Sequence, residues 1–144
     1  MTFTTILAQT TQGVCTLTLN RPEVRNAMSL AMVSELLSAL NTAEQDASVR
    51  AVVVRGSGGH FCAGGDISDM AQARMKMAQM QAAPDPVEGL NPVAETNAAF
   101  GRLCLAYARS PLPIVTVLEG TVMGGGFGLA CVADVALVCV GVIA

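Results

Sequence analysis

Two glycine-rich stretches contain the residues whose spacing points most clearly to chemistry. The first is the triplet at residues 124–126, which follows the apolar run Ile114–Leu118 and precedes a helix-compatible segment, residues 127–132. Glycine has no Cβ, so a ligand can approach the backbone, and the first N–H groups of a helix have no partner inside it. Such donors favour negative charge. A lone triplet is equally consistent with a simple tight turn.

The second stretch, residues 56–67, repeats this arrangement. It follows an expected strand at residues 51–55 and precedes a helix-like segment that begins near Ser68. Two glycine bends of this kind could direct two backbone N–H groups at one oxygen. Such a pair is an oxyanion hole, which stabilises charge that develops on a carbonyl oxygen.

The motifs around these bends resemble those of the enoyl-CoA hydratase/isomerase family, also called the crotonase superfamily. The resemblance extends from about Val14 to Asp134. Its motifs are Phe61-Cys62-Ala63-Gly64-Gly65-Asp66-Ile67, then Gly120 and Met123-Gly124-Gly125-Gly126-Phe127-Gly128-Leu129-Ala130, with Leu19-Asn20-Arg21-Pro22 and Asn26-Ala27-Met28 upstream. The resemblance implies a spiral of β-β-α units, an acyl-CoA substrate with no bound cofactor, and assembly as a homotrimer or hexamer.

The resemblance also assigns roles to individual residues. It implies that the backbone N–H groups of Gly65 and Gly125 bind the thioester oxygen and stabilise an enolate. It further implies that a set of residues contacts the coenzyme A part of the substrate: Val24, Arg25, Ala63, Gly65, Asp66, Ile67 and Ser68.

Several polar side chains near the bends have competing interpretations. Arg25 could meet a coenzyme A phosphate or could be a solvated loop residue. Asp66 is expected to cap the following helix rather than to exchange protons. His60 is expected to be exposed, with nothing nearby in sequence to orient it. Asp134 is expected to have a structural role between a helix and a strand.

The sequence departs from the family pattern where hydratases use acid and base groups. In those enzymes two glutamates activate the water that adds across the α,β double bond. The first position is Gly128 here, and the second would fall past residue 144. The triplet region looks closer to relatives that hydrate branched glutaconyl-CoA substrates, including the isohexenylglutaconyl-CoA type. The acyl group, the reaction direction and the acid/base residue stay open.

Two functions therefore remain in competition. One is an acyl-CoA enzyme, for which hydration is the expected reaction. The other is an inactive acyl-CoA-binding or oligomer-interaction module that keeps the oxyanion hole without the glutamates. Nucleotide-binding and serine-hydrolase functions are poorly supported, because the sequence contains neither a P-loop nor a G-x-S-x-G motif.

Composition limits the class of protein. Hydrophobic residues make up 52% of the 144 residues and charged residues 13%, so we expect some apolar surface to be covered by a partner or by further chain. A net charge of -3 without basic clusters argues against nucleic-acid binding. A signal peptide and a membrane span are not expected, and the cytoplasm is the expected location. Five scattered cysteines are expected to be buried thiols rather than disulfides or zinc ligands.

The periodicity of the chain predicts an α/β fold with a largely parallel sheet in one domain, residues 1–144. Strands are expected at residues 3–8, Val14–Leu19, 51–54 and Ile114–Leu118, and from Asp134 onward. The apolar strand at residues 51–54 is expected to be covered on both faces. Helices are expected at residues 30–41, with Ser29 as the N-cap, and at residues 68–81, 93–108 and 127–132, with a loop at residues 84–92. Four methionines of the second helix (Met70, Met75, Met77 and Met80) could line an acyl pocket or could serve ordinary packing. Compared with the family, the C-terminal helical region is missing, and we expect a chain truncated after residue 144.

Overall fold

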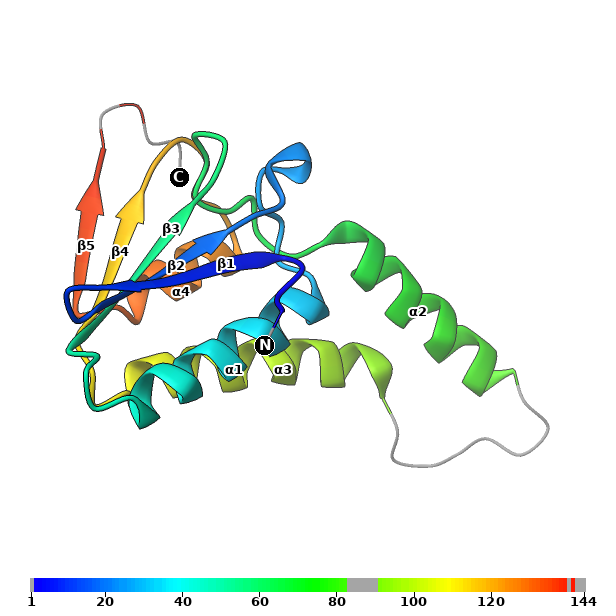
Figure 1. Cartoon of the computed structure of the whole chain (residues 1–144). Coiled ribbons are helices and arrows are strands. Elements are labelled where there is room, and N and C mark those ends of the chain that lie inside the picture. Colours follow the sequence, from blue (N-terminus) through cyan, green and yellow to red (C-terminus); the bar gives the residue numbers. More distant parts are fainter. Residues whose placement is uncertain (1, 83–90, 140, 142–144) are drawn as a thin grey trace.

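The computed structural model describes residues 2–82, 91–139 and 141, so most of the predicted loop at 84–92 lies outside the described residues. Strands and helices follow one another along the chain in the order that the sequence predicts (Figure 1). The strands are β1 (Ile6–Thr11), β2 (Val14–Leu19), β3 (Ala51–Gly56), β4 (Ile114–Leu118) and β5 (Val135–Val138). The helices are α1 (Leu30–Gln45), α2 (Ile67–Gln81), α3 (Pro92–Ala108) and α4 (Gly125–Cys131), with a short 3-10 turn, η1, at Pro22–Val24.

The five strands form one mixed sheet in the order β1-β2-β3-β4-β5. The β1–β2 pair is an antiparallel hairpin, and the other three pairs are parallel. The prediction of an α/β fold with a largely parallel sheet is therefore confirmed. Because parallel strands share their direction, the chain leaves β3 and β4 at the same edge of the sheet, and both glycine bends begin there.

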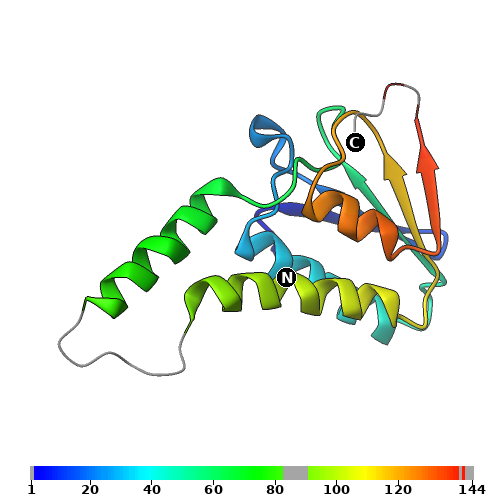
Figure 2. The same ribbon diagram turned by 180° about the vertical axis from the view of Figure 1, so that it is seen from behind.

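One face of the sheet builds the core. Leu17 of β2, Val54 of β3 and Thr116 of β4 are fully buried on this face, while their neighbours along each strand are partly exposed. Helices α1, α3 and α4 lie on this side (Figures 1 and 2). The expectation that β3 is covered on both faces is wrong, because its burial alternates and Arg55 is exposed.

Helix α1 connects this core to the start of the chain. The Ser29 side chain caps it by accepting a hydrogen bond from the Met32 N–H at 3.2 Å, as predicted. The helix continues to Gln45 rather than ending near residue 41, because Ala43 still packs into the core.

The first strand begins later than predicted, at Ile6. Thr4 and Thr5 instead donate backbone and hydroxyl hydrogen bonds to the carboxylate of Glu35 on α1. The hairpin then turns at Gln12 and Gly13, whose φ angles are 51° and 81°. Two consecutive positive φ angles are typical of the tight turn that matches the twist of a hairpin.

The last strand is fixed by a side chain that precedes it. Asp134 accepts a hydrogen bond from the Ile114 N–H at 2.7 Å, which joins the beginnings of β4 and β5 and confirms its structural role. All four residues of β5 are exposed. No helix within the described ranges is long and apolar enough to cross a membrane.

The contact between Glu35 and the N-terminal threonines predicts an acid-sensitive element. Burial alone would raise the pKa of Glu35, but the hydrogen bonds from Thr4 and Thr5 outweigh it and lower the pKa to about 2. A pKa that is lower in the folded state stabilises the fold above the unfolded value of about 4.3, and this contribution is lost as the pH falls from there towards 2. We expect Glu35→Gln to lower the free energy of unfolding at pH 7 by about 1–2 kcal/mol.

Denaturant unfolding at pH 7 and at steps below pH 5 measures this effect. The matched control is Glu23→Gln in η1, which makes the same chemical change at an exposed residue. An acid dependence that is identical in Glu35→Gln and the wild type would contradict the assignment.

Candidate functional site

Backbone hydrogen bonds join the two glycine bends. The Phe61 N–H donates to the Glu119 carbonyl at 2.7 Å, and the Cys62 N–H donates to the Thr121 carbonyl at 3.0 Å. In return, the Met123 N–H donates to the Cys62 carbonyl at 3.0 Å. The bends, which lie about 60 residues apart in the sequence, therefore extend the pairing of β3 and β4 beyond the ends of these strands.

Close packing at this junction requires glycine at two positions. A Cβ at Gly126 would lie 2.6 Å from the Cβ of Cys62 and 2.8 Å from its carbonyl oxygen. A Cβ at Gly64, where φ is 101°, would lie 3.2 Å from the Met123 carbonyl oxygen. The absence of side chains at Gly64 and Gly126 thus lets the two backbones touch.

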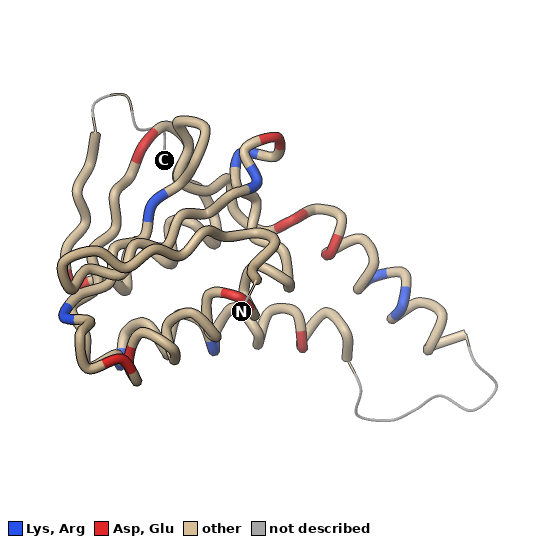
Figure 3. The backbone as a smooth tube through the Cα atoms, viewed as in Figure 1, with Lys and Arg blue, Asp and Glu red and all other residues tan. Residues whose placement is uncertain are grey.

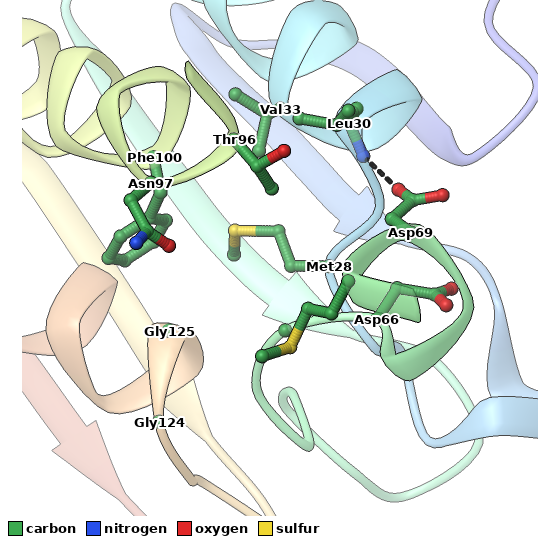
Figure 4. Close-up of a pocket in the computed structure, with 12 residues that line it drawn as sticks. Met28, Leu30, Val33, Asp66, Asp69, Thr96, Asn97, Phe100, Gly124 and Gly125 are labelled. Atoms are coloured by element: carbon green, nitrogen blue, oxygen red, sulfur yellow. Dashed lines mark hydrogen bonds between the residues drawn. The ribbon is translucent and has the colours of Figure 1, made fainter. Parts of the chain in front are cut away.

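A cleft of about 410 Å³ lies beside this junction (Figure 4). Helices α1 and α3 supply one part of its wall, and the two glycine bends with the start of α2 supply the other. The residues that line it are Met28, Leu30, Val33, Gly65, Asp66, Asp69, Met70, Thr96, Asn97, Phe100, Gly124 and Gly125.

Three glycines that line this cleft, Gly65, Gly124 and Gly125, have a backbone N–H group without a partner in the described chain. Within the described part of the chain, the amides of Gly65 and Gly125 donate no hydrogen bond, although their neighbours Gly64, Asp66 and Gly126 do. Gly65 is exposed and Gly125 half-buried, so both amides are accessible. The structure brings the two predicted donors to one cleft, and their joint binding of one oxygen stays a prediction.

A salt bridge fixes the start of α2 next to this cleft. Arg21 donates to the Asp66 carboxylate at 2.7 Å and to the Ala27 carbonyl. The other Asp66 oxygen accepts from the Ser68 N–H at 2.8 Å, which confirms the predicted cap. Burial tends to raise the pKa of Asp66, but Arg21 and the Ser68 amide outweigh it and lower the pKa. A carboxylate held ionised in this way is suited to positioning α2 rather than to proton transfer.

Comparison with known proteins identifies the group to which this architecture belongs. A model of the enoyl-CoA hydratase/isomerase family matches residues 9–139. The chain belongs to this family. It is 36% identical over 137 residues to a Rhodobacter capsulatus protein named "Probable enoyl-CoA hydratase", covering 95% of this chain and 47% of that protein.

Solved structures agree with this assignment and confirm the crotonase-like fold. A Marinobacter aquaeolei enoyl-CoA hydratase/isomerase superposes with a TM-score of 0.84 at 43% identity, covering 96% of this chain and 50% of that one. Pseudomonas aeruginosa AtuE superposes with a TM-score of 0.82 at 48% identity, covering 94% and 48%. The chain thus spans about half the length of the relatives it matches.

The other positions that the family resemblance singles out do not line the cleft, although they are neighbours in sequence or in hydrogen bonding of the first glycine bend. The Ala63 N–H donates to the Arg25 carbonyl at 3.0 Å, which places Val24, Arg25 and Ala63 in one neighbourhood. Ile67 and Ser68 follow Asp66 on α2, and both are exposed, Ile67 to 82%. Of the seven predicted coenzyme A contacts, only Gly65 and Asp66 line the cleft itself.

The position of the first family glutamate is closed by an aromatic ring. A Cβ at Gly128 would lie 3.1 Å from Cζ of Phe100, and a Cβ at Gly125 would lie 3.3 Å from Cε2 of the same ring. Phe100 of α3 therefore occupies the space into which a side chain at residue 128 would project. Among the described residues, no glutamate lines the cleft, and its two carboxylates belong to Asp66 and Asp69.

Several lining residues could not be identified from the sequence. Thr96, Asn97 and Phe100 are brought to the cleft by the packing of α3 against α1 and α4, and helical periodicity alone does not show which face meets a ligand. The sequence indicated that the methionines of α2 could line an acyl pocket, but only Met70 lines this cleft. Met75 is 61% exposed, and α2 has no buried residue, so ordinary core packing does not explain these methionines either.

Two expectations about single residues are wrong. His60 is half-buried and oriented, because its Nδ1 accepts a hydrogen bond from the Thr121 N–H at 3.1 Å. The partner lies 61 residues away and therefore gives no local signal. Cys15 and Cys62 are buried as predicted, and burial raises the pKa of the Cys62 thiol, but Cys131 is exposed.

The junction between the bends predicts a sharp difference between two Gly→Ala substitutions. Gly126→Ala would force a methyl group against Cys62, and we expect it to lower the free energy of unfolding by about 1–3 kcal/mol through overpacking. Gly101→Ala lies in α3 with nothing within 4 Å of the added methyl group. It should raise stability by about 0.5–1 kcal/mol through helix propensity. Denaturant unfolding of both variants tests this, and equal effects would show that the bends do not constrain Gly126.

Proposed function

We propose that the chain binds an acyl-CoA thioester with its carbonyl oxygen on the N–H groups of Gly65 and Gly125. The observation that carries this proposal is that both amides are accessible, lack a partner within the described part of the chain, and line one cleft. Donors fixed by the surrounding backbone need no reorganisation when charge develops on the oxygen, which is why they stabilise an enolate effectively.

The reaction that we propose is addition of water to an α,β-unsaturated acyl-CoA. The acyl group lies in the cleft against the apolar side chains of Met28, Val33 and Phe100. The coenzyme A moiety passes over the rim formed by Val24, Ala63, Ile67 and Ser68. Arg25, whose exposed side chain has no ion pair in the described chain, supplies a donor for a phosphate group.

This chemistry needs no cofactor beyond the coenzyme A that carries the substrate. We propose that the working form is a homotrimer or hexamer. The exposed apolar side chains of β5 support assembly, since Val135, Leu137 and Val138 are 48%, 54% and 66% exposed.

A second candidate function is acyl-CoA binding without turnover. One observation favours it: Phe100 fills the space beside Gly128, and no glutamate lines the cleft among the described residues. Water addition needs a group that exchanges protons, whereas thioester binding needs only the two amides. Mixing the chain with crotonyl-CoA separates the two candidates, because hydration removes the absorbance of the conjugated enoyl thioester and binding alone does not.

The assignment of the Gly125 amide can be tested by deleting one N–H group. Gly125→Pro removes the donor at the first position of α4, where proline fits a helix. We expect hydration to fall by about 10²–10³-fold. If the chain binds without turnover, the dissociation constant for butyryl-CoA should rise by roughly two- to tenfold, corresponding to one lost hydrogen bond.

Gly125→Ala is the matched control, because it adds a similar Cβ next to Phe100 but keeps the N–H group. Circular dichroism of both variants verifies that they fold. The amide assignment fails if the proline and alanine variants bind and turn over substrate equally well.

A further inference from the structure

A second cavity adjoins the cleft. An outer groove of about 440 Å³ lies between α2 and α3, and it shares Leu30, Asp69 and Thr96 with the inner cleft of about 410 Å³. The inner cleft includes the glycine bends, and on α2 the residues of the outer groove lie further along the helix than those of the inner cleft. The two cavities therefore adjoin at these three residues, and together we call them the trough, with the proposed thioester site at its inner end.

The length of this trough sets the size of ligand that would fill it. Asp66, the N-cap of α2, lines the inner end, and Lys76 lines the outer groove. The step of ten residues from Asp66 to Lys76 corresponds to about 15 Å at the rise of an α-helix. With C–C bonds of about 1.5 Å in a zigzag, an extended acyl chain needs roughly twelve carbon atoms to reach Lys76. A four-carbon acyl group would stay in the inner cleft.

Small side chains keep the outer groove open. Ala73 of α2 and Ala99 of α3 both line it and are both half-buried. A larger side chain at either position would project into the space between the helices. The width of the groove thus depends on the small side chains of Ala73 and Ala99.

A cation without a partner lies at the outer end. Lys76 is the only lysine of the chain, and it forms no ion pair within the described residues. The other charged groups of the groove have partners: Asp69 accepts from the Leu30 N–H at 2.7 Å, and Glu95 lies 3.9 Å from Arg102. Figure 3 shows the basic residues of α2 well beyond the acidic ones at its beginning.

We infer that the outer groove binds the distal end of a long acyl chain, and that Lys76 favours a chain that ends in a carboxylate. The inference rests on the proposed function, because it places the thioester of the same ligand on Gly65 and Gly125. The preferred substrate class is then the mono-CoA thioester of a long dicarboxylic acid. The apolar stem lies along Ala73 and Ala99, and its terminal carboxylate meets the Lys76 ammonium.

Calorimetric titration of the 144-residue chain with three ligands tests this: butyryl-CoA, dodecanoyl-CoA and the mono-CoA thioester of dodecanedioic acid. We expect dodecanoyl-CoA to bind at least about tenfold more tightly than butyryl-CoA, because more methylene groups leave water. The dicarboxylic ligand should bind roughly two- to fivefold more tightly still, which is the range for an exposed ion pair. Added salt should reduce only this last step.

Two variants with matched controls assign these effects to the groove. Lys76→Gln should abolish the preference for the terminal carboxylate, whereas Arg74→Gln removes a charge from the same helix outside the groove and should retain the preference. Ala73→Leu should weaken the binding of dodecanoyl-CoA about tenfold and change the affinity for butyryl-CoA by no more than about twofold, because the added side chain fills only the outer groove. Ala78→Leu, at an exposed position of α2 that lines neither cavity, should change the affinity for neither ligand.

The outcomes separate failure of this inference from failure of the proposed function. If butyryl-CoA binds but the terminal carboxylate brings no gain, or Arg74→Gln removes the gain as fully as Lys76→Gln, the role of Lys76 is overturned. If Ala73→Leu weakens short and long ligands equally, the groove is not a subsite. If none of the three thioesters binds, the proposed function itself fails, and this inference fails with it.

Discussion

The whole site depends on the direct contact between two backbone segments that follow neighbouring parallel strands. The hydrogen bonds between these segments use backbone groups of Phe61, Cys62 and Met123, whereas the amides of Gly65 and Gly125 donate none within the described chain. The contact distance tolerates no side chain at Gly126. Because the donors belong to the backbone, their direction is fixed by the fold and not by a rotamer, which is the kind of preorganisation that oxyanion stabilisation requires.

The buried side chain of Asn26 stabilises the first glycine bend through hydrogen bonds. Asn26, which is fully buried with a φ of 56°, donates to the carbonyls of Ser57 and His60 and accepts from the Arg21 N–H. The first glycine bend is thereby fastened to η1, and the Arg21–Asp66 salt bridge fastens the same region to α2. The segment before α1 and the two bends therefore form one connected unit, which explains why motifs far apart in the sequence occur together.

The sequence predicts those features that depend on local chemistry. Strand and helix order, the caps at Ser29 and Asp66, and the two glycine bends follow from propensity and from the types of neighbouring residues. Features that depend on distant partners could not be predicted. The later start of β1 reflects Glu35, the orientation of His60 reflects Thr121, and the closed space beside Gly128 reflects Phe100.

The apolar composition predicted uncovered surface, and the structure shows where it lies. Exposed apolar side chains gather on α2 and β5, where Ile67 and Val138 are 82% and 66% exposed, and Figure 3 shows no charged residue on β5. Helix α2 has no buried residue and packs against α3, and its side-chain hydrogen bonds to other elements, from Arg21 to Asp66 and from the Leu30 N–H to Asp69, lie at its beginning. The outer wall of the trough is thus more weakly supported than the inner one.

The proposed chemistry has two parts, oxyanion stabilisation and proton transfer, and they depend on different kinds of groups. The proposed oxyanion site is built from backbone that follows β3 and β4, so its two donors do not depend on the rotamer of a side chain. The proton-transfer half depends on side chains, and both carboxylates of the cleft already accept hydrogen bonds, Asp66 from Arg21 and Asp69 from the Leu30 N–H. In the function proposed above, the described part of the chain supplies the two amides that hold the thioester oxygen. Proton transfer to carbon or to water then needs a further group, because the carboxylates of Asp66 and Asp69 already accept hydrogen bonds.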